Sequence, residues 1–176
     1  VSIIWVSMLL LGCLIVVHII IHAIGLGITA VRAASIVSVS GAFGIIGAVI
    51  LGHIADRIGT KLTLIVIIIL YIVGSLWLLV ADELLMLYLF AVIFGLAYGG
   101  FFTVQSPVLA ELFGLRSHGA IFGVIYFITM IGGAAGPVLA GHIFDITSSY
   151  FGAFVTCAAL SSTGLILALF LKPVRR

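Results

Sequence analysis

Two histidines, His18 and His22, are the residues whose type and spacing best suit chemistry in this chain. They stand four positions apart in a long apolar stretch, so a helix would place both on one face. The pKa of an imidazole lies where protons exchange near neutral pH. The pair therefore predicts either a polar pathway that can carry protons or hydrogen bonds to neighbouring helices. A metal site is not expected, because two ligands are too few.

Four more polar side chains stand inside apolar stretches: Tyr98, Gln105, Tyr126 and Thr129. A polar group that faces lipid without a hydrogen bond costs free energy. We therefore expect these side chains to point inward and to line a substrate pathway together with the two histidines. Packing inside a helical bundle is the alternative.

One pentapeptide pattern occurs twice, each time at the end of an apolar segment. The copies are Gly52-His53-Ile54-Ala55-Asp56 and Gly141-His142-Ile143-Phe144-Asp145. A shared pattern in two otherwise different segments indicates internal duplication, a common construction of membrane transporters.

The composition is that of an integral membrane protein. Hydrophobic residues make up 65% of the 176 residues and charged residues only 7%, too few to cover a water-soluble globule. The net charge of +2 is small and scattered, so no nucleic-acid partner is expected. Cys13 and Cys157 both fall within apolar segments and indicate no disulfide framework.

Six apolar runs are long enough to cross the hydrocarbon core of a bilayer, which is about 30 Å thick. They are Ile3 to Ile24, Ala33 to Ile54, Leu62 to Val80, Leu84 to Leu109, Gly119 to Phe144 and Phe151 to Leu171. An even number of spans places both termini on the same side. We predict an all-α membrane protein built from two three-helix repeats, residues 1–80 and 81–176.

The orientation follows from the positive residues, which are retained in the cytoplasm. A cytoplasmic C-terminus puts six of them inside and leaves only Arg32 outside; the six are Arg57, Lys61, Arg116, Lys172, Arg175 and Arg176. We therefore expect both termini to be cytoplasmic.

Glycine recurs inside three of these spans, and proline occurs in two of them. Gly95 with Gly99, and Gly132 with Gly136, have the four-residue spacing that lets membrane helices approach closely. Pro107, together with the adjacent pair of Gly136 and Pro137, falls within predicted helices and could bend them.

The segment from Gly52 to Lys61 resembles the loop signature G-x-x-x-D-R-x-G-x-K of the major facilitator superfamily. The matching positions are Gly52, Asp56, Arg57, Gly59 and Lys61. Further stretches resemble the monocarboxylate and oxalate/formate branch of that family: Val17-His18, Glu111-Leu112-Phe113-Gly114-Leu115-Arg116 and Gly136-Pro137-Val138-Leu139-Ala140-Gly141. The resemblance covers the whole chain and corresponds to the second half of a twelve-helix protein.

This resemblance implies a secondary transporter of the plasma membrane, the inner membrane in a bacterium. It would move a small organic solute, with a monocarboxylate among the candidates, as a uniporter, symporter or antiporter. No cofactor is implied, and the facing partner is an N-terminal six-helix half in the same chain or another. The branch often holds a basic residue inside its eighth or eleventh helix, whereas residues 33–54 and 120–144 contain no Lys or Arg.

In the family, the signature Asp contacts the N-terminal end of a helix in the opposite half. The resemblance gives this role to Asp56, with Arg57 and Lys61 as anchors, and the contact would break when the halves rock. The alternative is an ordinary positive loop that fixes only the topology.

Two other classes of protein compete with the transporter. A non-transporting six-helix subunit that assembles with another chain fits the same composition. An intramembrane serine protease needs a Ser in a glycine-rich turn and a His on another helix. Only Ser38-Val39-Ser40-Gly41 comes near that pattern, and the last span holds no His. We therefore expect no enzymatic activity.

Overall fold

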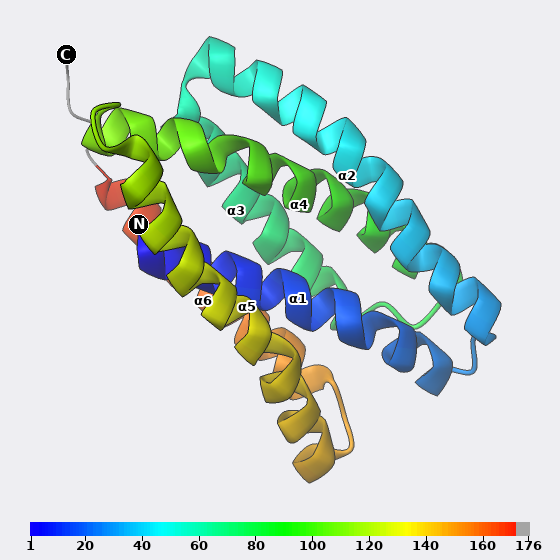
Figure 1. The fold of residues 1–176 in the computed structure, drawn as a ribbon. Coiled ribbons are helices and arrows are strands. Elements are labelled where there is room, and N and C mark those ends of the chain that lie inside the picture. Colours follow the sequence, from blue (N-terminus) through cyan, green and yellow to red (C-terminus); the bar gives the residue numbers. More distant parts are fainter. Residues whose placement is uncertain (172–176) are drawn as a thin grey trace.

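The structure, a computed structural model, describes residues 1–171 as six α-helices joined by short turns (Figure 1). They are α1 (Ser2–Gly25), α2 (Ala30–Ile58), α3 (Thr60–Trp77), α4 (Leu84–Phe113), α5 (His118–Thr147) and α6 (Phe151–Phe170). Each helix is long and apolar enough to cross a membrane. The predicted all-α membrane fold is confirmed.

Successive helices run in opposite directions, so the charged turns gather at the two ends of the bundle. We call the end with Arg57, Lys61 and Arg116 the basic end, and the end with Asp82, Glu83 and Asp145 the acidic end. The start of α1 and the end of α6 both lie at the basic end (Figure 1). Three more residues predicted to be cytoplasmic lie outside the described residues: Lys172, Arg175 and Arg176.

The α2 helix extends beyond the apolar run that predicts it. It continues past Ile54 to Ile58 and includes Asp56 and Arg57 in its last turn. The family signature describes Gly52 to Lys61 as a loop, whereas in the structure the turn is the single residue Gly59. Charged side chains such as those of Asp56 and Arg57 do not end the α2 helix, because at the end of a membrane span they can face water while the backbone stays helical.

Three pairs of helices account for most of the packing. The α2 helix lies along α4 (Figure 1), α5 packs on α1, and α3 packs on α6. Most of the apolar core comes from α1, α3 and α4. In the most apolar stretch of α2 only 17% of the residues are buried, and in α5 only 28%, against 61% in α1. The α2 and α5 helices therefore present the largest surfaces for lipid or another protein.

Glycines allow the closest helix contacts. A Cβ atom at Gly99 of α4 would collide with the carbonyl oxygen of Gly44 in α2, and one at Gly136 of α5 with that of Leu10 in α1. In lipid, where apolar burial does not drive helices together, such backbone contact supplies the packing energy. The close approach predicted from the glycine spacing is confirmed.

Candidate functional site

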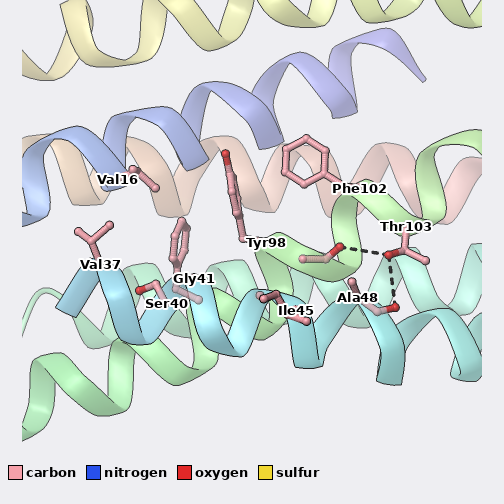
Figure 2. Close-up of a pocket in the computed structure, with 12 residues that line it drawn as sticks. Val16, Val37, Ser40, Gly41, Ile45, Ala48, Tyr98, Phe102 and Thr103 are labelled. Atoms are coloured by element: carbon pink, nitrogen blue, oxygen red, sulfur yellow. Dashed lines mark hydrogen bonds between the residues drawn. The ribbon is translucent and has the colours of Figure 1, made fainter. Parts of the chain in front are cut away.

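An open groove of about 560 Å³ lies between α1, α2 and α4 (Figure 2). This volume is in the range of small-molecule sites. Its walls are Val16 from α1, residues of α2 and residues of α4; the α2 and α4 residues are Val37, Ser40, Gly41, Gly44, Ile45, Ala48, Phe94, Tyr98, Gly99, Phe102 and Thr103.

The groove owes its shape to three aromatic residues in successive turns of α4. The Tyr98 ring stacks on Phe94, with centroids 5.4 Å apart, and meets Phe102 edge to face at 5.0 Å. The opposing α2 wall contributes Gly41 and Gly44, which leave space where larger side chains would fill it. A four-residue spacing puts all three rings on one face of α4, so the site has an aromatic wall and a glycine wall.

The polar groups of the groove are hydroxyls. Ser40 donates a hydrogen bond to the Ile36 carbonyl at 3.0 Å, and Thr103 donates to the carbonyls of Ala48 and Gly99, both at 3.3 Å (Figure 2). Both hydroxyls therefore donate to backbone carbonyls: Ser40 within α2, and Thr103 both within α4 and across to α2. No charged side chain is present among the described residues that line the groove. It suits an uncharged, largely apolar group.

The pathway residues predicted from the sequence do not all meet in this groove. Tyr98 lines it. Gln105 is seven residues from Tyr98 and therefore lies on the same face of α4. Its side chain is buried, at 2% exposed, and its Nε2 has no hydrogen-bond partner within residues 1–171. On α5, Tyr126 stacks on Phe122, and the buried Thr129 donates to the Ile125 carbonyl of its own helix.

His18 of α1 lies outside the groove, and its side chain contacts α5 and the residue before α6. Its Nε2 is 2.9 Å from the Pro137 carbonyl oxygen, and its Nδ1 is 3.1 Å from the Tyr150 hydroxyl. A carbonyl can only accept, so Nε2 carries a proton; in the tautomer with that proton alone, Nδ1 accepts from the Tyr150 hydroxyl. Both ring nitrogens of His18 therefore have partners in this structure.

His22 lies one turn nearer the acidic end and meets the same tyrosine. Its ring makes edge contacts with Tyr150 and Phe154, at centroid distances of 5.9 and 5.0 Å. It also borders two openings of about 300 and 390 Å³ at the acidic end. Burial raises the pKa of the Tyr150 phenol, and the Asp145 carboxylate raises it further, so Tyr150 stays protonated at neutral pH. The two histidines thus lie on one face of α1 and contact the same tyrosine, while their role in a pathway stays a prediction.

The signature loop is a one-residue turn at the basic end. Gly59 has a φ of +91°, which L side chains rarely adopt, so the turn favours glycine. Asp56 and Arg57 are exposed on the last turn of α2. Lys61 donates to the Leu169 carbonyl at 2.9 Å, where its charge meets the negative end of α6.

A contact that the sequence did not predict joins α3 to α4 beside this turn. The Thr60 hydroxyl donates to the Glu111 carboxylate at 2.6 Å. Thr60 is the first residue of α3, so the carboxylate also lies near the positive end of that helix. The only sequence signal was the position of Glu111 in a family motif.

The two prolines lie inside continuous helices. Pro107 and Pro137 interrupt neither α4 nor α5, although each removes one backbone donor. The Pro137 carbonyl accepts the His18 bond, and its neighbour Gly136 touches α1. Bending at these positions stays a prediction.

Six membrane-length helices with polar side chains inside the bundle define a multi-pass integral membrane protein. The family model described as Major Facilitator Superfamily matches residues 1–176, and the chain belongs to this superfamily. As the sequence predicted, the family is one of transporters rather than of enzymes.

Among curated relatives, monocarboxylate transporter 12 of Homo sapiens is 29% identical over 165 residues, which cover 91% of this chain and 32% of that protein. Monocarboxylate transporter 7 of Homo sapiens is 31% identical over 159 residues, covering 86% of this chain and 30% of the relative. The uncharacterized MFS-type transporter YcxA of Bacillus subtilis is 26% identical over 135 residues, covering 73% and 33%. The chain therefore spans about a third of the length of these relatives.

Proposed function

We propose that this chain is the C-terminal six-helix half of a secondary transporter that moves a small organic solute by alternating access. The groove between α1, α2 and α4 carries the proposal, because it is a small-molecule cavity at membrane depth that lies open on the bundle surface. A second six-helix half, from the same or another chain, would close it. Transporters of this kind bind their solutes between two such halves near the midplane.

The chemistry of the groove bears on the solute. The relatives' names make a monocarboxylate the first candidate. An ionised carboxylate would lose its hydration here without meeting a positive charge, which is unfavourable. This half would therefore hold the apolar body of the solute near Tyr98, and the facing half would bind the carboxylate.

We also propose that the half consists of two three-helix repeats, residues 1–80 and 81–176. The shared pattern extends further than one pentapeptide: Gly44, Gly47 and Gly52 of α2 have the same spacing as Gly133, Gly136 and Gly141 of α5. The packing of α2 on α4 and of α5 on α1 supports an equivalent role for these helices.

The proposed gate is the exposed carboxylate of Asp56 at the basic end. It is free to approach a helix N-terminus of the facing half, which attracts negative charge. Arg57 and Arg116 at the same end support a cytoplasmic position for this end and for both termini, in the plasma membrane.

The test is uptake of radiolabelled lactate and pyruvate into proteoliposomes. The isolated chain should not transport either probe, whereas the chain assembled with its six-helix partner half should. Tyr98→Ala should reduce that uptake, and Ile69→Ala on the exposed side of α3 should not. Uptake by the isolated, monomeric chain would refute the half-transporter. A stable pair that takes up neither probe would favour the non-transporting subunit.

A further inference from the structure

Gly12 of α1 lies directly behind the aromatic wall of the groove. It is buried, and it does not line the groove itself. A Cβ atom at this position would lie 2.5 Å from Cε2 and 3.0 Å from Cδ2 of the Tyr98 ring, and 3.5 Å from the Tyr71 hydroxyl. The absence of a side chain at Gly12 is what lets the Tyr98 ring lie back against α1.

The surroundings of the Tyr98 ring decide where it would go if it were pushed. Phe94 stacks on it and Phe102 meets it edge to face, so neighbouring rings block movement along α4. The groove is the side with room, and Tyr98 already forms part of its wall (Figure 2). A larger residue at Gly12 must therefore move the ring into the groove.

We propose that Gly12 sets the width of the groove and thereby the size of the uncharged, apolar group that the groove accepts. This inference rests on the proposed function for its biological meaning, but the width itself is a property of this chain. Gly12 would be a specificity-determining residue that acts through Tyr98 without touching the solute.

The size of the effect follows from the contact distance. Carbon atoms pack well at about 3.5–4.0 Å, so Gly12→Ala should displace the near edge of the ring by about 1 Å. A difference of one methylene in a hydrophobic pocket changes discrimination by about tenfold or more. Large apolar groups should lose access to the groove by about that factor, while the smallest should be unaffected.

The experiment measures the width with thiol reagents. Cys13 and Cys157 are replaced by alanine, and a single cysteine is placed in the groove by Ser40→Cys. The purified chain then reacts with the methyl and benzyl esters of methanethiosulfonate, both uncharged. The ratio of the benzyl rate to the methyl rate reports the room beside residue 40. An exposed cysteine, Ser148→Cys, supplies the intrinsic ratio.

Gly12→Ala should lower this ratio at position 40 about tenfold, and Tyr98→Ala should abolish the effect in the double variant. Gly25→Ala, at the end of the same helix with nothing within 4 Å of the added atom, should leave the ratio unchanged. An unchanged ratio in Gly12→Ala would overturn the inference. So would an equal fall in the presence and absence of the Tyr98 ring.

If Gly12→Ala does not fold, the double variant with Tyr98→Ala should fold, because the two nearest atoms to the added Cβ belong to the Tyr98 ring. A double variant that fails to fold where Tyr98→Ala folds would overturn the inference, and so would an unchanged ratio in Tyr98→Ala. The measurement needs no transport. A ratio that behaves as expected without any uptake refutes only the proposed function, and uptake with an insensitive ratio refutes only the role of Gly12.

Discussion

Replacing Gly136 by alanine should loosen the contact between α5 and α1. The added Cβ would collide with the Leu10 carbonyl oxygen and would lie 3.0 Å from its carbon and 3.3 Å from its Cα. These are backbone atoms, so the helices must separate. Overpacking of this kind costs about 1–3 kcal/mol, and the higher helix propensity of alanine returns about 0.5–1 kcal/mol. The expected net loss is about 0–2.5 kcal/mol, and about 1–3 kcal/mol relative to an alanine that meets nothing.

The assay is unfolding in mixed micelles with increasing dodecyl sulfate, followed by far-ultraviolet circular dichroism. Gly123→Ala on the same helix is the matched control, because nothing lies within 4 Å of its added atom. It should be neutral or stabilising. Gly47→Ala meets the Leu96 backbone in the equivalent place on α2 and should behave like Gly136→Ala. If Gly136→Ala were as stable as Gly123→Ala, the close-packing explanation would be wrong.

Three further predictions concern the gate, the topology and the histidine contact. In the assembled transporter, Asp56→Asn should remove a contact of about 0.3–2 kcal/mol. Cysteines placed in the pathway at the basic end should then react faster with thiol reagents, and uptake should fall, whereas Asp145→Asn should change neither. If Asp56→Asn changed neither, the loop would only fix the topology. In intact cells, an impermeant thiol reagent should label a cysteine at Ser148 but not at Ser117, and the reverse pattern would invert the orientation. Tyr150→Phe should lower the free energy of unfolding by about 1–3 kcal/mol, because it leaves the buried His18 Nδ1 without a partner. Because the pKa of the Tyr150 phenol is raised, its stabilising contribution is present at neutral pH and is lost as pH rises through that raised pKa. Unfolding of both variants at several pH values checks this.

The membrane fold could be read from the sequence because hydrocarbon thickness sets the length of a span. The precise ends could not be read in this way. The α2 helix includes Asp56 and Arg57 because its backbone hydrogen bonds continue where the apolar run stops. The loop signature covers Gly52 to Lys61 and did not show that the turn is one residue long, since the positive φ of Gly59 is a property of the folded backbone.

The candidate site was predictable in its residue types but not in its grouping. The spacing of His18 and His22 correctly indicated one shared surface, and Tyr98 was named as a pathway residue. The contact of Gly12 with Tyr98 was not predictable, because it depends on which helices are neighbours. Gly12 lies in no motif, and the sequence alone does not indicate which residue of another helix a glycine contacts.

The turn at Gly59 also has a mechanical consequence. Through Thr60 and Lys61, the start of α3 is bonded to the end of α4 and to the end of α6, and through Gly59 it is joined directly to α2. Four helices thus meet at one junction with no slack between them. The connections at the acidic end, residues 26–29, 78–83 and 148–150, are all longer than this turn. The order of the chain therefore restrains α2 relative to α3 more tightly at the basic end than at the acidic end.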